Sequence, residues 1–73
     1  MSRVAAIGEE WRIRGFAMAG VGVVAVADEA AARAAWEALE ADVGLVILTP
    51  AAAQGLRREL TVATRRLWVE LPR

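Results

Sequence analysis

The sequence predicts a three-layer α/β fold, in which helices cover both faces of a four-stranded parallel sheet. The first observation is that short apolar runs alternate with segments of helical spacing along all 73 residues, and this alternation is typical of a parallel sheet. The second is that residues 4–7 and 43–48 carry no charge, which suits strands buried on both faces. These two strands should be central. The expected strand order is 2-1-3-4 with three helices, a flavodoxin-like or receiver-like topology.

The first strand is predicted at residues 4–7, and Gly8 provides a tight turn after it. A helix should begin at Glu9, where acidic charge in the first turn complements the helix dipole. Gly20 should end this helix and allow the next strand to start. The stripe expected to face the sheet, at spacing i, i+3, i+4 and i+7, comprises Ile13, Phe16, Ala17 and Gly20.

The second unit combines a valine-rich run with an alanine-rich helix. Residues 21–26 predict a second buried strand, and Asp28 is a suitable N-cap for a helix over residues 29–41. Arg33 and Glu37 form an i, i+4 pair on the outer side of this helix. Its apolar stripe comprises Ala32, Ala35, Trp36 and Leu39, so Trp36 is expected in the core.

The third unit begins with the central strand at residues 43–48 and is followed by Thr49-Pro50, a helix start with Thr as N-cap and Pro at the first helical position. That helix should reach residue 60, weakened at Gly55 by up to about 1 kcal/mol. Residues 61–66 read as a polar connection. Alternating residues 67–71 then predict a half-exposed edge strand that ends at Pro72.

Chain handedness predicts an unevenly covered sheet. Parallel crossovers are right-handed in about 98% of cases, so the first helix should cover one face alone while the others share the opposite face. Strands three and four would then expose an apolar patch on the single-helix face, and such patches mark partner surfaces. On the last strand, we expect Trp68 and Glu70 on this thin side. Leu67, Val69 and Leu71 would lie beneath the helices of the other side.

Composition argues against several classes of function. Formal net charge is zero, from nine basic and nine acidic residues, whereas nucleic acids and anionic membranes select basic proteins. The charge-free residues 15–27 are too few for a membrane span of about 20 residues, and no signal peptide is recognisable. We therefore expect a soluble, cytoplasmic protein.

The sequence also lacks most reactive side chains. It contains no Cys, His or Tyr and no Lys, which leaves carboxylates and four hydroxyls for acid–base or nucleophilic work. Soft metals lack their usual ligands. The expectation is a protein without catalytic residues, metal or cofactor.

The crevice beyond strands one and three, where such sheets bind ligands, would hold Gly8, Glu9, Glu10, Thr49 and Pro50. A receiver domain would need a phosphoacceptor Asp after strand three and a later Lys, and both are missing here. We interpret Glu9 and Glu10 as solvated first-turn charges, with a metal or phosphate role as the weaker alternative.

Two groups of residues are candidates for an interface. Trp11 lies off its helix's apolar stripe, and it and Trp68 are as consistent with an interface as with incidental surface. Arg57-Arg58 and Arg65-Arg66 form a basic zone. Solvated surface is the simpler interpretation of this zone, and a rim facing an acidic partner is the alternative. The interface candidates are Trp11, Trp68, Glu70, Arg57 and Arg58.

Five short pieces, in order and with intact spacing, resemble the F subunit of the V/A-type (vacuolar/archaeal-type) rotary ATPases. The family opens with a strand and Ile-Gly-Asp-Glu, then Gly-Phe and Ala-Gly-Ile. It continues with a Gly-Ile-Val-Leu-Ile-Thr strand and a Val-Val-Glu-Ile-Pro ending. The matching positions here are 7–10, 15–16, 19–21, 44–49 and 68–72. The family-motif residues carried over are Gly8, Gly15, Phe16, Ala19 and Gly20, all in structural roles. Trp11, Arg12 and Arg14 depart from the family's small or acidic residues.

This resemblance implies a non-catalytic component of the central rotor stalk. Such a component binds the coiled coil of the D subunit, helps couple ATP turnover to ion (proton) transport, and associates peripherally with the membrane through the complex. The family pattern continues past Pro72 into a C-terminal helical tail, whereas this sequence ends at Arg73. Residues 1–73 are therefore expected to be one domain without that tail. The alternative function is a stand-alone protein-interaction module, receiver-like but without the phosphoacceptor Asp, that forms a homodimer through the same patch.

Overall fold

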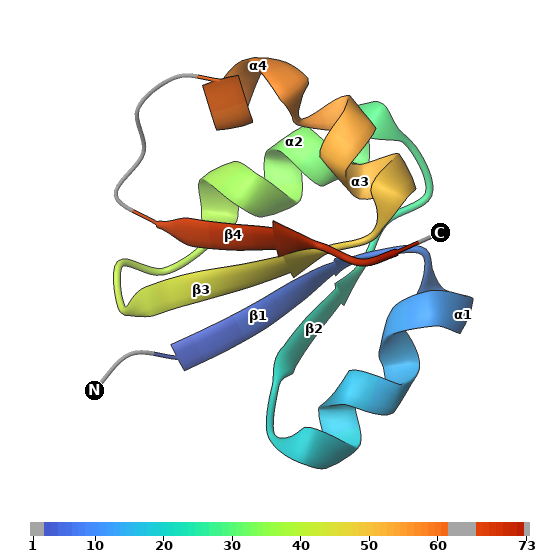
Figure 1. Cartoon of the computed structure of the whole chain (residues 1–73), viewed down its shortest axis with the longest axis vertical. Coiled ribbons are helices and arrows are strands. Elements are labelled where there is room, and N and C mark those ends of the chain that lie inside the picture. Colours follow the sequence, from blue (N-terminus) through green and yellow to red (C-terminus); the bar gives the residue numbers. More distant parts are fainter. Residues whose placement is uncertain (1–2, 62–65, 73) are drawn as a thin grey trace.

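The computed structural model describes residues 3–61 and 66–72, and it confirms a four-stranded parallel sheet in the order β2-β1-β3-β4. The strands are β1 (Arg3–Gly8), β2 (Gly22–Ala25), β3 (Val43–Leu48) and β4 (Leu67–Glu70). The helices are α1 (Glu10–Ile13), the 3-10 helix η1 (Arg14–Ala19), α2 (Glu29–Ala38), α3 (Pro50–Gly55) and α4 (Arg57–Thr61). Figure 1 shows α1 on one side of the sheet and α2, α3 and α4 on the other. The three layers follow from this arrangement.

The core lies between the two central strands and the α2–α3 layer. Ala5 of β1 is in register with Val46 of β3, and Ile7 with Leu48. These side chains are buried, and parallel register places each pair on one face of the sheet. The predicted placement of Trp36 in the core is confirmed, because its side chain is only 8% exposed. The buried cluster comprises Ala5, Ile7, Ala32, Trp36, Val43, Val46, Leu48, Ala52, Ala53 and Leu56.

Helix α2 begins where the sequence predicts and ends three residues earlier. The Asp28 carboxylate accepts a hydrogen bond of 2.8 Å from the Ala31 N–H, which confirms the N-cap. After Ala38 the chain becomes extended at Leu39. The chain that follows the helix, up to the start of β3, accepts hydrogen bonds from the Arg66 guanidinium, at 3.1 Å to the Leu39 carbonyl, 2.8 Å to that of Glu40 and 3.2 Å to that of Val43. Arg66 therefore holds the α2–β3 connection through its backbone.

The first helix differs from its prediction. Only one α-helical turn forms before the chain tightens into η1, and the apolar stripe is buried only at Ile13, with Phe16 half-buried and Ala17 exposed. The predicted stop is confirmed, since Gly20 has a φ of 81° in the left-handed region that favours glycine. A tighter helix turns each successive residue through a larger angle. For this reason, residues spaced for a helix of 3.6 residues per turn no longer share one face beyond Ile13.

Strand β2 was predicted to be buried, and that prediction is wrong. Three of its four residues are exposed, and only Val24 packs against the core. The reason is topological. β2 lies at the edge of the sheet with β1 as its one neighbour, so valines on its other face receive cover only from α1 and η1.

The third helix is two helices, α3 and α4, joined at the fully buried Leu56. Gly55 does not simply weaken a continuous helix. A Cβ atom at this position would lie 3.1–3.2 Å from three atoms of Glu29. Glycine thus allows α3 to pass close to the first turn of α2.

Strand β4 faces the opposite way from the prediction. Its register pairs Trp68 with Val46 and Glu70 with Leu48, and both β3 residues belong to the core beneath the helices. Trp68 and Glu70 therefore lie on the side of α3 and α4, while Leu67 and Val69 lie on the α1 side. Leu71 lies just past the strand, where its N–H donates to the Leu48 carbonyl at 2.8 Å. The predicted connection over residues 61–66 falls mainly on residues 62–65, outside the described part of the chain.

Replacing Arg66 tests how much its hydrogen bonds to the α2–β3 connection stabilise the fold. We expect Arg66→Ala to lower the free energy of unfolding by about 2 kcal/mol, because hydrogen bonds from a charged donor are lost. Arg66→Lys should recover only part of this loss, since an ammonium group lacks the planar set of donors of a guanidinium. Urea unfolding measures the difference, with exposed Arg58→Ala as the matched control. Equal midpoints for Arg66→Ala and Arg58→Ala would contradict the assignment.

Candidate functional site

The carboxyl ends of β1 and β3 come together as the sequence predicts, around a buried threonine. The Thr49 hydroxyl donates to the Glu9 carboxylate and accepts a hydrogen bond of 3.3 Å from the Ala52 N–H. Thr49 is fully buried. Gly8 makes room for it, because a Cβ at position 8 would lie 2.6 Å from the threonine Oγ1 and 2.9 Å from its Cβ.

This arrangement leaves few free polar groups for catalysis or ligand binding. The hydrogen bond from Thr49 holds the pKa of Glu9 below its ordinary value of 4.5, burial works in the opposite direction, and the nearby Arg12 charge lowers the pKa further. Glu9 is thus an ionised acceptor engaged by Thr49, not the solvated first-turn charge that we predicted, while Glu10 is exposed in that turn. Among the described residues, no group of three acidic, His or Cys side chains could hold a metal ion. The crevice has a structural role, because the Thr49–Glu9 hydrogen bond joins the chain just after β1 to the chain just after β3.

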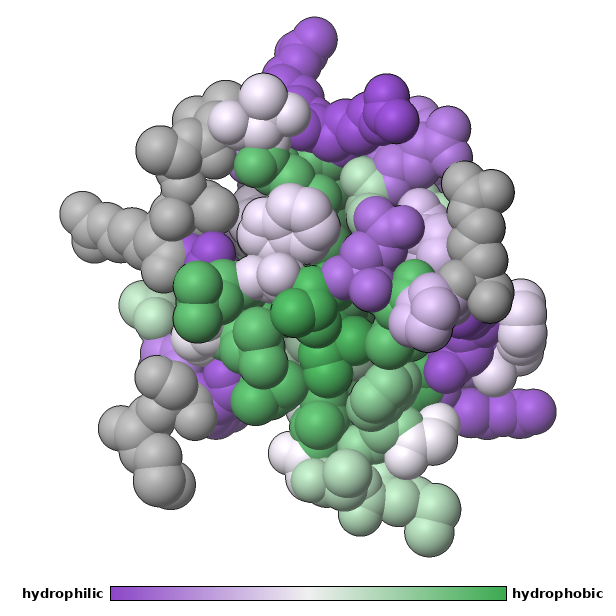
Figure 2. All heavy atoms as spheres, in the orientation of Figure 1, coloured by the Kyte–Doolittle hydropathy of each residue, from purple (hydrophilic) through white to green (hydrophobic). Residues whose placement is uncertain are grey.

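The more extensive feature is the face of the sheet on the α1 side. Helix α1 contacts β1 and β2, and together with η1 it is the helical cover on this side, so β3 and β4 lie beyond it (Figure 1). Leu67 is 72% exposed and Val69 48%. Figure 2 shows apolar side chains gathered over the strands. We call this surface the open sheet face; its residues are Val4, Val23, Leu45, Ile47, Leu67 and Val69.

Sequence reasoning found the existence of the open sheet face but missed most of its residues. On β1 and β3 the signal was present, because in a strand alternate apolar residues face opposite sides. Val4, Leu45 and Ile47 could have been assigned once Ala5, Val46 and Leu48 were placed in the core. On β4 the assignment needed the register with β3, which no local pattern contains.

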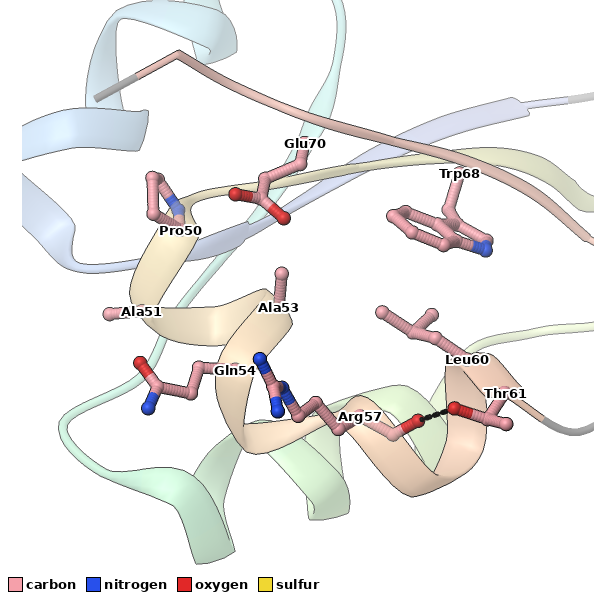
Figure 3. A pocket seen from close by; sticks show the side chains of 9 residues that line it. All are labelled: Pro50, Ala51, Ala53, Gln54, Arg57, Leu60, Thr61, Trp68 and Glu70. Carbon is pink, nitrogen blue, oxygen red and sulfur yellow. Dashed lines mark hydrogen bonds between the residues drawn. The ribbon is translucent and has the colours of Figure 1, made fainter.

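The structure separates the five interface candidates. Trp68, Glu70 and Arg57 lie around one groove between β4 and the α3–α4 layer (Figure 3). Arg58 is exposed on α4 but does not line this groove. Trp11 lies on α1 and is 70% exposed, with the Arg12 guanidinium 5.6 Å from its ring centre.

Arg12 also connects α1 to the end of the chain. Its guanidinium donates to the Pro72 carbonyl at 2.8 Å, sixty residues away in the sequence. It lies near enough to Glu9 to lower that residue's pKa. The arginine that departs from the family pattern thus has a structural role here.

The five family-motif residues have unequal structural roles. Gly8 and Gly20 are required, the first by the close approach of Thr49 and the second by its positive φ. Gly15 has no atom within 4 Å of the position of a Cβ. Phe16 is half-buried and Ala19 is exposed. None of the five offers a reactive group.

The described residues contain no helix that is both long enough and apolar enough to cross a membrane. A sequence model of the family of ATP synthase (F/14-kDa) subunits matches residues 4–72. Apart from Arg3, the first residue of β1, the match includes every strand and helix that the structure describes. Neither the curated proteins nor the solved structures gave a significant match.

Gly8→Ala should destabilise the fold by roughly 3 kcal/mol, because the added methyl group overlaps the fully buried Thr49. Gly15→Ala is the matched control, and we expect a change within about 0.5 kcal/mol because its Cβ would meet open space. Thermal or urea unfolding of both variants provides the measurement. Similar losses at the two positions would contradict the close approach.

Thr49→Val should make the protein less sensitive to acid. The folded pKa of Glu9 lies below its ordinary value of 4.5, so its contribution to stability is present above that pH and is lost as pH falls through the folded pKa. The variant should therefore lose more stability at pH 7 than at pH 3, on top of about 1 kcal/mol for the lost cap.

Unfolding titrations at several pH values measure this difference, and Thr49→Ser is the control because it keeps the hydroxyl. In a Glu9→Gln background the effect of Thr49→Val should not depend on pH. If the pH dependence persisted in that background, the Thr49–Glu9 hydrogen bond would not be its source.

Proposed function

Since the chain belongs to the family of ATP synthase (F/14-kDa) subunits, that of the F subunit of V/A-type rotary ATPases, we propose that it is a non-catalytic component of the central rotor stalk. Its partner there is the coiled coil of the D subunit. The observation that carries this proposal is the open sheet face. An exposed apolar surface on a protein this small usually marks a partner site.

The chemistry of the open sheet face suits a coiled coil. Its six residues are all aliphatic, and none carries a polar side chain that would need a partner. A coiled coil buries its apolar a and d stripes between its own helices, so the surface that binds here would be formed by apolar side chains outside that seam. Burying an exposed side chain such as Leu67 contributes about 1.5–3 kcal/mol, so a few such contacts would support stable binding.

The proposed role in coupling is mechanical. The buried cluster joins β1, β3, α2 and α3 through close packing, and a packed core transmits displacement because it resists compression. A domain of this kind, held by the stalk, can help to transmit rotation between ATP turnover and proton or other ion transport. The protein would then lie at the cytoplasmic side of the membrane, attached through the complex, without cofactor or active site of its own.

The open sheet face is tested with a double variant, Leu67→Glu together with Val69→Glu. Both side chains are already exposed, so the fold should tolerate the change while affinity for a purified D-subunit coiled coil falls at least a hundredfold, because charges would be buried. Isothermal titration calorimetry measures this affinity. The matched control is Arg33→Glu with Glu37→Arg on the exposed side of α2.

The binding of Trp11→Ala to the coiled coil is measured in the same series. Trp11 is highly exposed and lies on α1, on the same side of the sheet as the open sheet face. If the wild-type protein did not bind the D-subunit coiled coil, the proposal would be contradicted. A stable homodimer that forms through Leu67 and Val69 would instead favour the stand-alone interaction module.

A further inference from the structure

A groove lies on the other side of the sheet, between β4 and the α3–α4 layer. Its volume is about 510 Å³. Figure 3 shows Trp68 over Leu60, with Ala53 beside them and the Glu70 carboxylate pointing from β4 toward α3. Leu60 packs against the core, and Trp68 is 38% exposed. The groove is lined by Pro50, Ala51, Ala53, Gln54, Arg57, Leu60, Thr61, Trp68 and Glu70.

The groove carries one charge of each sign. Glu70 projects from β4 and Arg57 from α4. Within residues 3–61 and 66–72, the salt bridges join Arg3 to Glu40 and Asp42, so neither groove charge has an ionic partner there. Both residues are exposed. The groove therefore combines the apolar side chains of Trp68, Leu60 and Ala53 with one charge of each sign, neither of them in a salt bridge with another described residue.

Among residues 3–61 and 66–72, the helical layer leaves β4 less covered than β3. Helices α2 and α3 contact β1, and α3 contacts β3, whereas every residue of β4 is exposed. Val46 is fully buried while Trp68, its register partner on the same face, is not. Neighbouring helices pack with axes 8–10 Å apart. One more helix beside α3 and α4 would cover Trp68 and complete the layer.

We propose that this groove docks an amphipathic helix from another component of the same ATPase, distinct from the coiled coil on the open sheet face. The helix places an aliphatic side chain between Trp68 and Leu60. A Lys or Arg on it pairs with Glu70, and an Asp or Glu pairs with Arg57. Charge complementarity across both walls sets the direction of the helix. The inference rests on the proposed function for the identity of the complex. The binding surface itself is inferred from the groove alone.

The test uses the soluble part of the ATPase assembled without this chain, to which the whole protein is added. Glu70→Lys and Arg57→Glu should each weaken binding about tenfold, since each places like charges together. Arg58→Glu is the matched control, because Arg58 is exposed on the same helix but does not line the groove. Unfolding temperatures verify that each variant folds.

A photo-reactive benzoylphenylalanine at Ala51, an exposed lining residue, identifies the occupant by mass spectrometry. The same group at Ala34, exposed on α2, controls for random capture. Cross-links from position 51 to a helix with neighbouring basic and acidic residues support the proposal. Cross-links to a second copy of this chain, to a non-helical segment or to nothing overturn it.

The outcomes separate this inference from the proposed function. If the groove variants bind like wild type while the Leu67→Glu, Val69→Glu variant does not, the groove proposal is wrong and the proposed function stands. If wild-type protein does not join the ATPase at all, both are wrong. Weakened binding by both sets of variants supports two separate surfaces.

Discussion

The pairing of β1 with β3 is the constraint on which the rest of the molecule depends. Ala5 opposite Val46 and Ile7 opposite Leu48 form the buried centre of the sheet, and α2 and α3 pack directly onto it. This pairing also brings Gly8 against Thr49 at the carboxyl ends of the strands. Because β4 takes its register from β3, the same pairing decides which side chains each face of the sheet presents.

Both surfaces that we propose for binding follow from this register. With Val46 turned toward the helices, Trp68 must face them too, and it forms one wall of the groove. Leu67 and Val69 must then face the other side, where α1 covers β1 and β2. The sheet thus separates an aliphatic surface from a mixed one that carries Trp68, Glu70 and Arg57. Two surfaces of different chemistry are consistent with association with an ATPase complex, which membership of the ATP synthase (F/14-kDa) subunit family implies.

Arginines contribute to the fold more than a count of surface charges would indicate. Arg66 holds the connection between α2 and β3 through three backbone carbonyls, and Arg12 joins α1 to Pro72. Arg3 pairs with Glu40 and Asp42 in the same α2–β3 connection. A domain of 73 residues buries a smaller fraction of its surface than a larger one. Interactions between distant segments therefore contribute a larger share of its stability.

Local composition, spacing and chain handedness were enough to predict the strand order, the helix N-caps at Asp28 and Thr49 and the core position of Trp36, while the resemblance of short motifs indicated the family. Tertiary structure decided what local pattern does not contain. It tightened the first helix into η1, joined the α2–β3 connection to Arg66, and set the side of the sheet on which Trp68 lies. The last two depend on contacts between segments far apart in the chain. A strand's own alternation shows which residues share a face, and only its neighbour's register shows which face that is.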